Sequence, residues 1–177
     1  FYVRARDGVE LAALKKRVQA CFEAGALATG TRLETNWGRV DCLDLKTNWP
    51  LAHAYEANAK TLGRELMDPA MLPPGLAGST DMGNVSHRVP SIHPMIQVSP
   101  PSVVIHNAEF TAYAKSERGD QAIVDGAKAL AMTTLDFFAG ADLRTAAKAD
   151  FAKTRDLSKA AVGSAFHNDG VLGGLPA

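Results

Sequence analysis

Two hydrophobic periods follow each other in the N-terminal part of the chain. Residues 1–6 alternate apolar and polar side chains, which is typical of a half-buried strand, and Asp7-Gly8 ends the alternation. From about Val9 to Thr29 apolar residues recur every three or four positions, which predicts an amphipathic helix that ends at Gly30. Residues 31–45 return to alternation. The pattern therefore predicts a strand, a helix and a second strand.

The rest of the chain predicts further helices with two short strands between them. Asn48 and Pro50 mark the start of a helix that runs to Gly63, and the apolar runs 92–98 and 103–105 predict strands. Helices are expected over 120–139 and 142–159. The inward stripe of the first of these is predicted to contain Ile123, Gly126, Ala127, Leu130, Thr134 and Phe137.

These elements predict an α/β fold class with a domain boundary near Lys46. Residues 1–46 form one unit, residues 47–159 form a second, and residues 160–177 are expected to be an irregular tail because they lack periodicity. The chain opens without an initiator Met, in the middle of an alternating stretch, so we expect it to be part of something longer.

Composition excludes several classes of function. The 177 residues are 46% hydrophobic and 21% charged, and 19 basic side chains balance 19 acidic ones, so no electrostatic signal for nucleic acid or an anionic membrane follows. No apolar run approaches the roughly 20 residues that span a bilayer. Cys21 and Cys42 are expected to be buried thiols rather than a disulfide scaffold, and the protein is expected to be cytoplasmic.

Histidines are the first candidates for chemistry, because imidazole binds metals and carries protons near neutral pH. His53 lies mid-helix and is interpreted as a partly buried structural residue, and His167 lies in the tail, two residues before Asp169. His106 ends an apolar, β-branched run, a position from which side chains point into the ligand crevice of α/β sheets.

The loop that precedes His87 and His93 allows two interpretations. Residues 78–86 are rich in Gly, Ser, Thr, Asp and Asn, which suits the N-cap of a short helix and equally suits a binding loop. Spacing alone leaves both open. A phosphate-binding loop is disfavoured, because the glycine spacing and the lysine of such loops are missing.

The loop and the histidines together resemble a known family. Gly78-Ser79-Thr80-Asp81, the following stretch through His87 and His93-Pro94, and His106 with Glu109-Phe110 resemble the aminoacylase and glutamate-carboxypeptidase family of zinc metallopeptidases. The likeness is to its amidohydrolase branch, which contains p-aminobenzoyl-glutamate hydrolase and aminoacylase-like dipeptidases. It extends to about Lys159, and residues 1–34 resemble the second half of the family's small dimerisation lid.

The resemblance implies a partial α/β lid followed by the carboxyl-terminal part of a phosphorylase/hydrolase-like catalytic domain. It implies hydrolysis of amide bonds in N-acyl amino acids or small peptides, with two divalent metals, usually zinc, per site, and a homodimer formed through the lid. His106 matches the family's last metal-binding histidine. Asp81 matches an acidic turn at the site, and Asn84, His87 and His93 are expected to line the same cleft.

The family's other metal ligands and its general base precede the lid, and this chain has no Glu-Glu pair to match them. We therefore assign no catalytic residue and expect the carboxyl-terminal portion of a metal-dependent amidohydrolase, inactive alone. The alternative is a non-catalytic remnant, or a dimerisation module, of the same fold.

Overall fold

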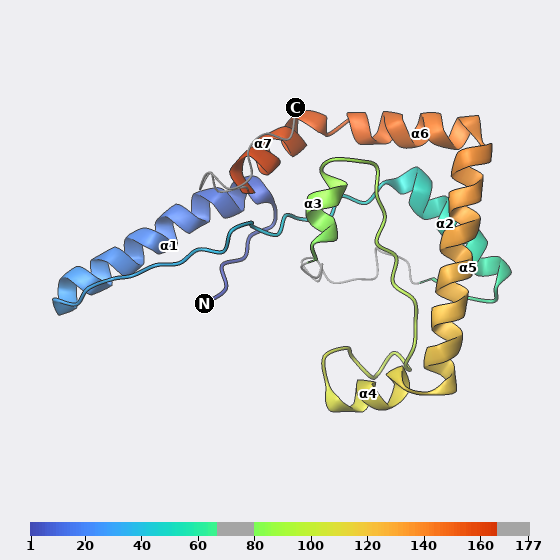
Figure 1. Cartoon of the computed structure of the whole chain (residues 1–177), viewed down its shortest axis with the longest axis horizontal. Helices are drawn as coiled ribbons and strands as arrows, with labels where there is room; N and C mark the ends of the chain where they lie inside the picture. The colour runs from blue at the N-terminus through green and yellow to red at the C-terminus, as the bar shows by residue number, and fades with distance from the viewer. Residues whose placement is uncertain (67–79, 166–177) are drawn as a thin grey trace. The chain divides into compact units, whose positions relative to one another are not determined.

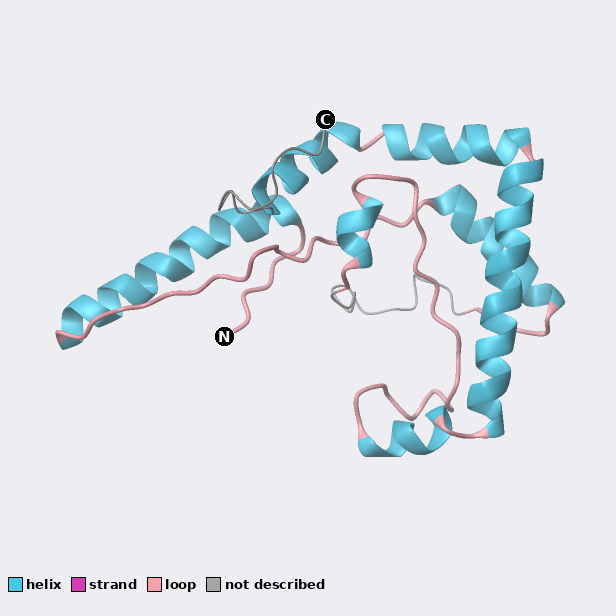
Figure 2. Ribbon diagram, in the orientation of Figure 1, coloured by secondary structure: helices cyan, strands magenta, loops and turns pink. Residues whose placement is uncertain are grey.

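The computed structural model describes residues 1–66 and 80–165, which form seven α-helices in two compact units (Figures 1 and 2). The first unit contains residues 1–46, 80–89 and 154–165, and the second contains residues 47–66 and 90–153. The predicted loop over 68–79, the end of the predicted tail, and His167 with Asp169 lie outside the described residues.

The first unit is built on helix α1 (Gly8–Thr29), which begins and ends as the sequence predicts. The Asp7 side chain accepts a hydrogen bond from the Glu10 backbone N–H at 2.8 Å, and Gly30 closes the helix in the left-handed region at φ 65°. Helix α7 (Arg155–Ala165) packs against α1. A small apolar core forms there from Leu43, Ala161 and Ala165.

The second unit packs helix α2 (Trp49–Thr61) against α5 (Glu117–Ala139) and α6 (Ala141–Ala152), and the shorter α4 (Ala108–Ala114) also contacts α5. Three helices begin with side-chain caps, in which Asn48, Asn107 and Ser116 accept backbone N–H groups. The core is formed by Tyr55, Ala59 and Ala129, with Ile92 against it. Small side chains allow these helices to lie close together.

The expected α/β fold class is not supported, because the described residues are largely helical. They contain no strand at 1–6, 31–45, 92–98 or 103–105, and Val40 alone makes an isolated β-bridge. A strand exists only when a neighbouring backbone binds its N–H and C=O groups. Residues 31–41 instead lie along α1, where Trp37 Nε1 donates to Gln19 Oε1 at 3.0 Å (Figure 1).

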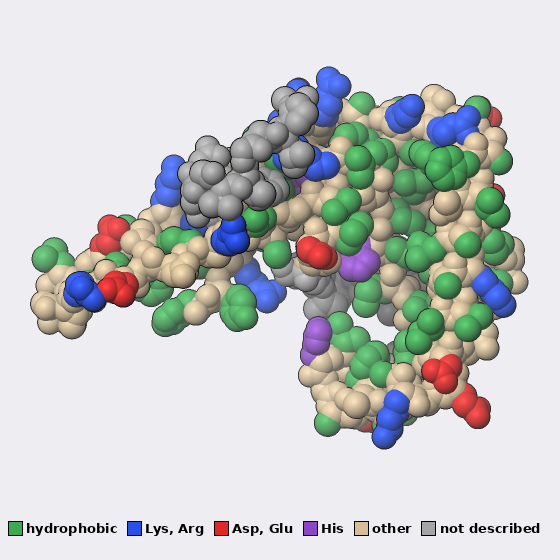
Figure 3. All heavy atoms as spheres, in the orientation of Figure 1, with side chains coloured by type: hydrophobic (Ala, Val, Ile, Leu, Met, Phe, Trp, Pro, Cys, Tyr) green, Lys and Arg blue, Asp and Glu red, His purple; other side chains and the backbone are tan. Residues whose placement is uncertain are grey.

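The helices predicted over 9–29, 48–63 and 120–139 are confirmed, but the buried face of α5 differs from the prediction. Helix α5 buries Gly119, Ala122, Asp125, Ala129 and Thr133. The predicted stripe was therefore wrong by about a quarter turn, and Ile123 is 70% exposed. Apolar side chains are visible at the surface over α5 (Figure 3).

Four further expectations were wrong. The single helix expected over 142–159 is two helices, α6 and α7, and residues 160–165 of the expected tail belong to α7. Cys21 and Cys42 are both exposed. His53 is also exposed, beside Trp49 with ring centroids 6.0 Å apart.

Candidate functional site

The predicted binding loop contains a short helix, α3 (Met82–Ser86). Asp81 occupies its N-cap position but makes no side-chain capping bond, and the Met82 N–H is instead bonded to Thr80 Oγ1 at 3.3 Å. Asp81 is exposed. The interpretation of this loop as a helix cap therefore applies to Thr80, which accepts the Met82 N–H. The Asp81 carboxylate makes no capping bond and is accessible to solvent.

Asn84 binds α3 to the backbone of residues 41–43. Its Oδ1 accepts the Leu43 N–H at 2.9 Å, and its Nδ2 donates to the Asp41 carbonyl at 3.0 Å. Gly83 lies so close to this segment that a Cβ atom there would be 1.9 Å from the Leu43 carbonyl oxygen. The Asn84 side chain thus binds backbone N–H and C=O groups that a neighbouring strand would bind in a sheet.

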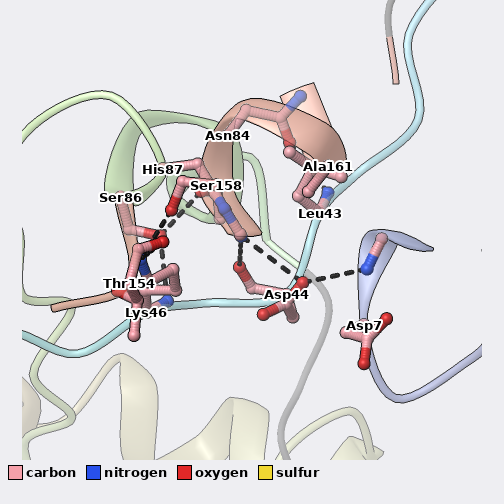
Figure 4. A network of polar contacts seen from close by, with 12 residues as sticks. Asp7, Leu43, Asp44, Lys46, Asn84, Ser86, His87, Thr154, Ser158 and Ala161 are labelled. Carbon is pink, nitrogen blue, oxygen red and sulfur yellow. Dashed lines mark hydrogen bonds and ion pairs between the residues drawn. The ribbon is translucent and has the colours of Figure 1, made fainter. Parts of the chain in front are cut away.

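Ser86 and His87 extend the contact to Asp44 and Lys46 (Figure 4). Ser86 Oγ accepts the Lys46 N–H at 2.9 Å and donates to the Gly83 carbonyl at 2.7 Å. His87 Nε2 lies 3.0 Å from the Asp44 carbonyl oxygen, and its side chain is only 4% exposed. Because a carbonyl only accepts, Nε2 carries the ring hydrogen.

The contacts of Asp44 and Lys46 with other parts of the first unit were not predicted from the sequence. Asp44 Oδ1 accepts the Gly8 N–H at 3.1 Å and lies 3.4 Å from His87 Nε2. Lys46 Nζ donates to Ser158 Oγ at 2.6 Å. No sequence signal pairs these residues, because positions 44–46 and 158 are far apart along the chain and carry no motif.

His93 and His106 belong to the second unit, and both side chains are exposed. His106 has φ 66°, and it is the one non-glycine residue of the described ranges with a positive φ. The next residue, Asn107, caps α4 by accepting the Phe110 N–H at 2.8 Å. Helix α4 thus begins directly after His106, whose left-handed backbone costs roughly 1–3 kcal/mol.

A second polar cluster, at Arg64, was also missed by the sequence reasoning. Arg64 Nε donates to Asp125 Oδ2 at 2.9 Å, and Gln121 Nε2 donates to Oδ1 at 2.8 Å. The Gln121 hydrogen bond, aided by Arg64 and opposed by desolvation, lowers the pKa of Asp125. Burial raises the pKa of the nearby Tyr55, and the Arg64 charge partly offsets that effect.

The donor set of the described residues does not fit a complete metal centre. Zinc in proteins takes three or four protein donors, and nowhere in the described ranges do three or more His, Cys, Asp or Glu side chains gather in one group. His106 offers one accessible imidazole.

Comparison with known proteins relates the chain to peptidases. It is 36% identical over 151 residues to the Xaa-Arg dipeptidase of Homo sapiens, which covers 85% of this chain and 34% of the relative. It is 38% identical over 136 residues to the Xaa-Arg dipeptidase of Mus musculus, which covers 77% of the chain and 31% of the relative. No family model matches. The chain thus spans about a third of the length of these relatives.

These matches support the predicted relation to a peptidase and amidohydrolase family. The particular branch, the zinc, the homodimer through residues 1–46 and the cytoplasmic location stay predictions. In the described part of the chain, no helix is both long and apolar enough to cross a membrane.

Proposed function

We propose that this chain is a portion of a metal-dependent peptidase that hydrolyses the amide bond of dipeptides or N-acyl amino acids. The observation that supports this most directly is the identity of 36% to the human Xaa-Arg dipeptidase over 85% of the chain. By analogy with that relative's name, dipeptides with a carboxyl-terminal arginine are the first substrates to test.

In this proposal His106 supplies one metal donor. Its imidazole is exposed and therefore available to a ligand. Its backbone has an unfavourable positive φ directly before the cap of α4, and strained residues concentrate at functional sites. The metal, when bound by a full set of donors, would lower the pKa of a bound water toward 7.

His87 has a different role in the proposal. Its side chain is 4% exposed, and Nε2 is bonded to the Asp44 carbonyl, so it is a positioning residue of the Asp81 loop and no ligand. Asp81 in the first unit and His93 in the second are both exposed, and their role as lining residues stays a prediction. Asn84 is proposed to act through the backbone contacts that hold α3 in place.

The test is a chimera in which this chain replaces the matched third of the human Xaa-Arg dipeptidase. We expect the chimera to hydrolyse an Xaa-Arg dipeptide and His106→Ala to lower kcat/KM by about 100-fold or more, because the loss of one direct donor opens the metal site. Metal content measured on the same samples should fall with activity.

His53→Ala is the matched control, since His53 is also exposed and lies on α2 in the same unit. It should leave activity and metal content unchanged. A chimera that folds but neither binds metal nor hydrolyses peptides would favour the alternative, a non-catalytic remnant. The 177-residue chain alone is expected to be inactive, because it lacks a complete donor set in its described residues.

A further inference from the structure

A cavity of about 240 Å³ lies within the second unit, where α2 ends. Its walls come from α2 and the residues that follow it, from residues 95–97, and from the first turn of α5. Sites for drug-sized ligands have volumes of roughly 300–1,000 Å³, so this cavity suits a smaller molecule. Its polar lining residues are Tyr55, Arg64, Glu65, Gln97 and Arg118.

Tyr55 is a buried residue of this lining whose hydroxyl has no protein partner. The residue is 3% exposed, and buried tyrosine hydroxyls usually find a hydrogen-bond partner. Among the described residues, His87 Nδ1 is the one fully enclosed side-chain nitrogen or oxygen that lacks a partner. The Tyr55 hydroxyl, which makes no hydrogen bond to the described residues, must therefore reach the cavity that Tyr55 lines.

The Tyr55 hydroxyl is available as a donor at neutral pH. Burial raises the pKa of Tyr55, and the Arg64 charge offsets only part of that effect. The hydroxyl therefore keeps its proton near pH 7 and can donate it to an acceptor in the cavity.

Arg118 supplies a second donor that the protein does not use. It is exposed, and it makes neither an ion pair nor a hydrogen bond with any other part of the chain that the structure describes. It precedes Asp125 by seven residues, or about two helical turns, so both lie on the same face of α5. Arg118 thus places a positive charge beside the Arg64 cluster.

The charge of Arg64 itself is already balanced. Its Nε and Nη2 atoms lie 2.9 and 2.8 Å from Asp125 Oδ2, and Nη1 donates to the Gln97 carbonyl at 3.2 Å. A guanidinium has five N–H groups, so two remain for a ligand. Arg64 therefore adds donors to the cavity without adding net charge, and Arg118 carries the attraction for an anion.

We propose that this cavity binds a small aliphatic carboxylate. The carboxylate accepts hydrogen bonds from the Arg118 guanidinium and the Tyr55 hydroxyl, and charge-assisted bonds of this kind are the strong ones. The aliphatic body packs against Leu66, Met95 and Ile96, which form the apolar part of the lining. This inference does not depend on the proposed peptidase activity.

Two kinds of molecule carry this chemistry, a simple carboxylic acid and an α-amino acid. Glu65 distinguishes them, because its exposed carboxylate lines the same cavity and makes no ion pair with Arg118 or another described residue. The ammonium group of an amino acid would be attracted to Glu65. A simple carboxylate would gain nothing there.

An NMR titration of the 177-residue chain tests the proposal, with the side-chain Nε–H signals of arginine as the readout. Isovalerate should bind with a dissociation constant of about 1 mM and should shift the Arg118 signal. Isovaleramide, its neutral isostere, should bind about tenfold more weakly or less, because it lacks the charge. Equal binding of the two, or no binding of isovalerate and L-leucine, would overturn the proposal.

L-Leucine identifies the source of the carboxylate. If leucine binds more tightly than isovalerate, and Glu65→Gln removes the difference, the ligand is an amino acid. If leucine binds more weakly, the ligand is a simple carboxylic acid.

Two variants assign the contacts. Tyr55→Phe keeps the ring and removes only the hydroxyl, so it should weaken isovalerate binding about fivefold or more while the urea midpoint stays at that of the parent. Arg118→Gln should weaken binding about tenfold or more. Lys148→Gln, at an exposed residue of α6 in the same unit, is the matched control and should bind as the parent does.

Circular dichroism checks that every variant keeps its helices. Parental binding in both Tyr55→Phe and Arg118→Gln would overturn the assignment of the cavity as a carboxylate site. A lowered urea midpoint in Tyr55→Phe together with parental binding would show that the hydroxyl serves the fold, and it would contradict the proposal as well.

Discussion

The two units hold their helices in place by different means. In the first unit, α3 is bound to residues 41–46 by hydrogen bonds from Asn84, Ser86 and His87 to or from the backbone. In the second unit, α2 and α5 meet through Ala59 and Ala129 around Tyr55. Hydrogen bonds are directional, so the groups that they join can shift very little without losing the bond. Contacts between small apolar side chains remain favourable after a small shift of the helices. The first unit should therefore be the more sensitive to substitution.

A pair of glycines gives the largest expected difference. Gly83→Ala should lower the free energy of unfolding by about 3 kcal/mol or more, because its Cβ would lie 1.9 Å from the Leu43 carbonyl oxygen and backbone must move. Gly126→Ala meets only the Ile96 side chain, at 3.6 Å, and should raise stability by about 0.5–1 kcal/mol through helix propensity. Urea unfolding followed by circular dichroism measures both.

Equal effects of the two alanines would show that the close approach at Gly83 is not rigid. Gly25→Ala is the control for helix propensity alone, since nothing lies within 4 Å of a Cβ atom at that position of α1. It should stabilise about as much as Gly126→Ala does.

Two asparagines provide the next comparison. Asn84→Ala leaves the Leu43 N–H and the Asp41 carbonyl without their partner and should cost about 2 kcal/mol, because unsatisfied buried groups lose their hydration. Asn58→Ala removes bonds to Thr133 Oγ1 and Asp136 Oδ2, and it should cost below about 1 kcal/mol because the exposed Asp136 carboxylate is rehydrated. Denaturant titration of the two variants decides between them.

Helices were predictable from the sequence because their signals are local. Asp7, Asn48 and Asn107 each accept a backbone N–H within three residues, and Gly30 ends α1 as expected. The buried face of α5 was not predictable, because the helix is apolar on more than one side. Its neighbours α2, α4 and α6 decide which side is buried.

Strand existence and the polar contacts depend on distant parts of the chain. Residues 92–98 have the predicted alternation, but a strand also needs a partner backbone that local sequence does not contain. The same holds for the site. His106 and the loop before His87 were predicted as site residues from a motif, whereas the contacts of Asp44, Lys46 and Ser158 join residues far apart in the sequence and follow no motif.

The smallest expected effect is a pH dependence of the second unit. The Gln121 and Arg64 hydrogen bonds lower the pKa of Asp125 from its ordinary value of 3.8, so the folded state binds this proton less tightly than the unfolded state. The stabilisation is therefore present above about pH 4 and is lost as the pH falls through the lowered pKa. Asp125→Asn should reduce the slope of unfolding free energy against pH below pH 4 while leaving it unchanged near pH 7.

Asp81→Asn, at an exposed carboxylate without a capping bond, is the control and should leave the acid slope near that of the parent. Urea midpoints measured from pH 2.5 to 7 provide the readout. If the slope below pH 4 in Asp125→Asn equals that of the parent, the hydrogen bonds of Gln121 and Arg64 to Asp125 do not contribute to the pH dependence of stability.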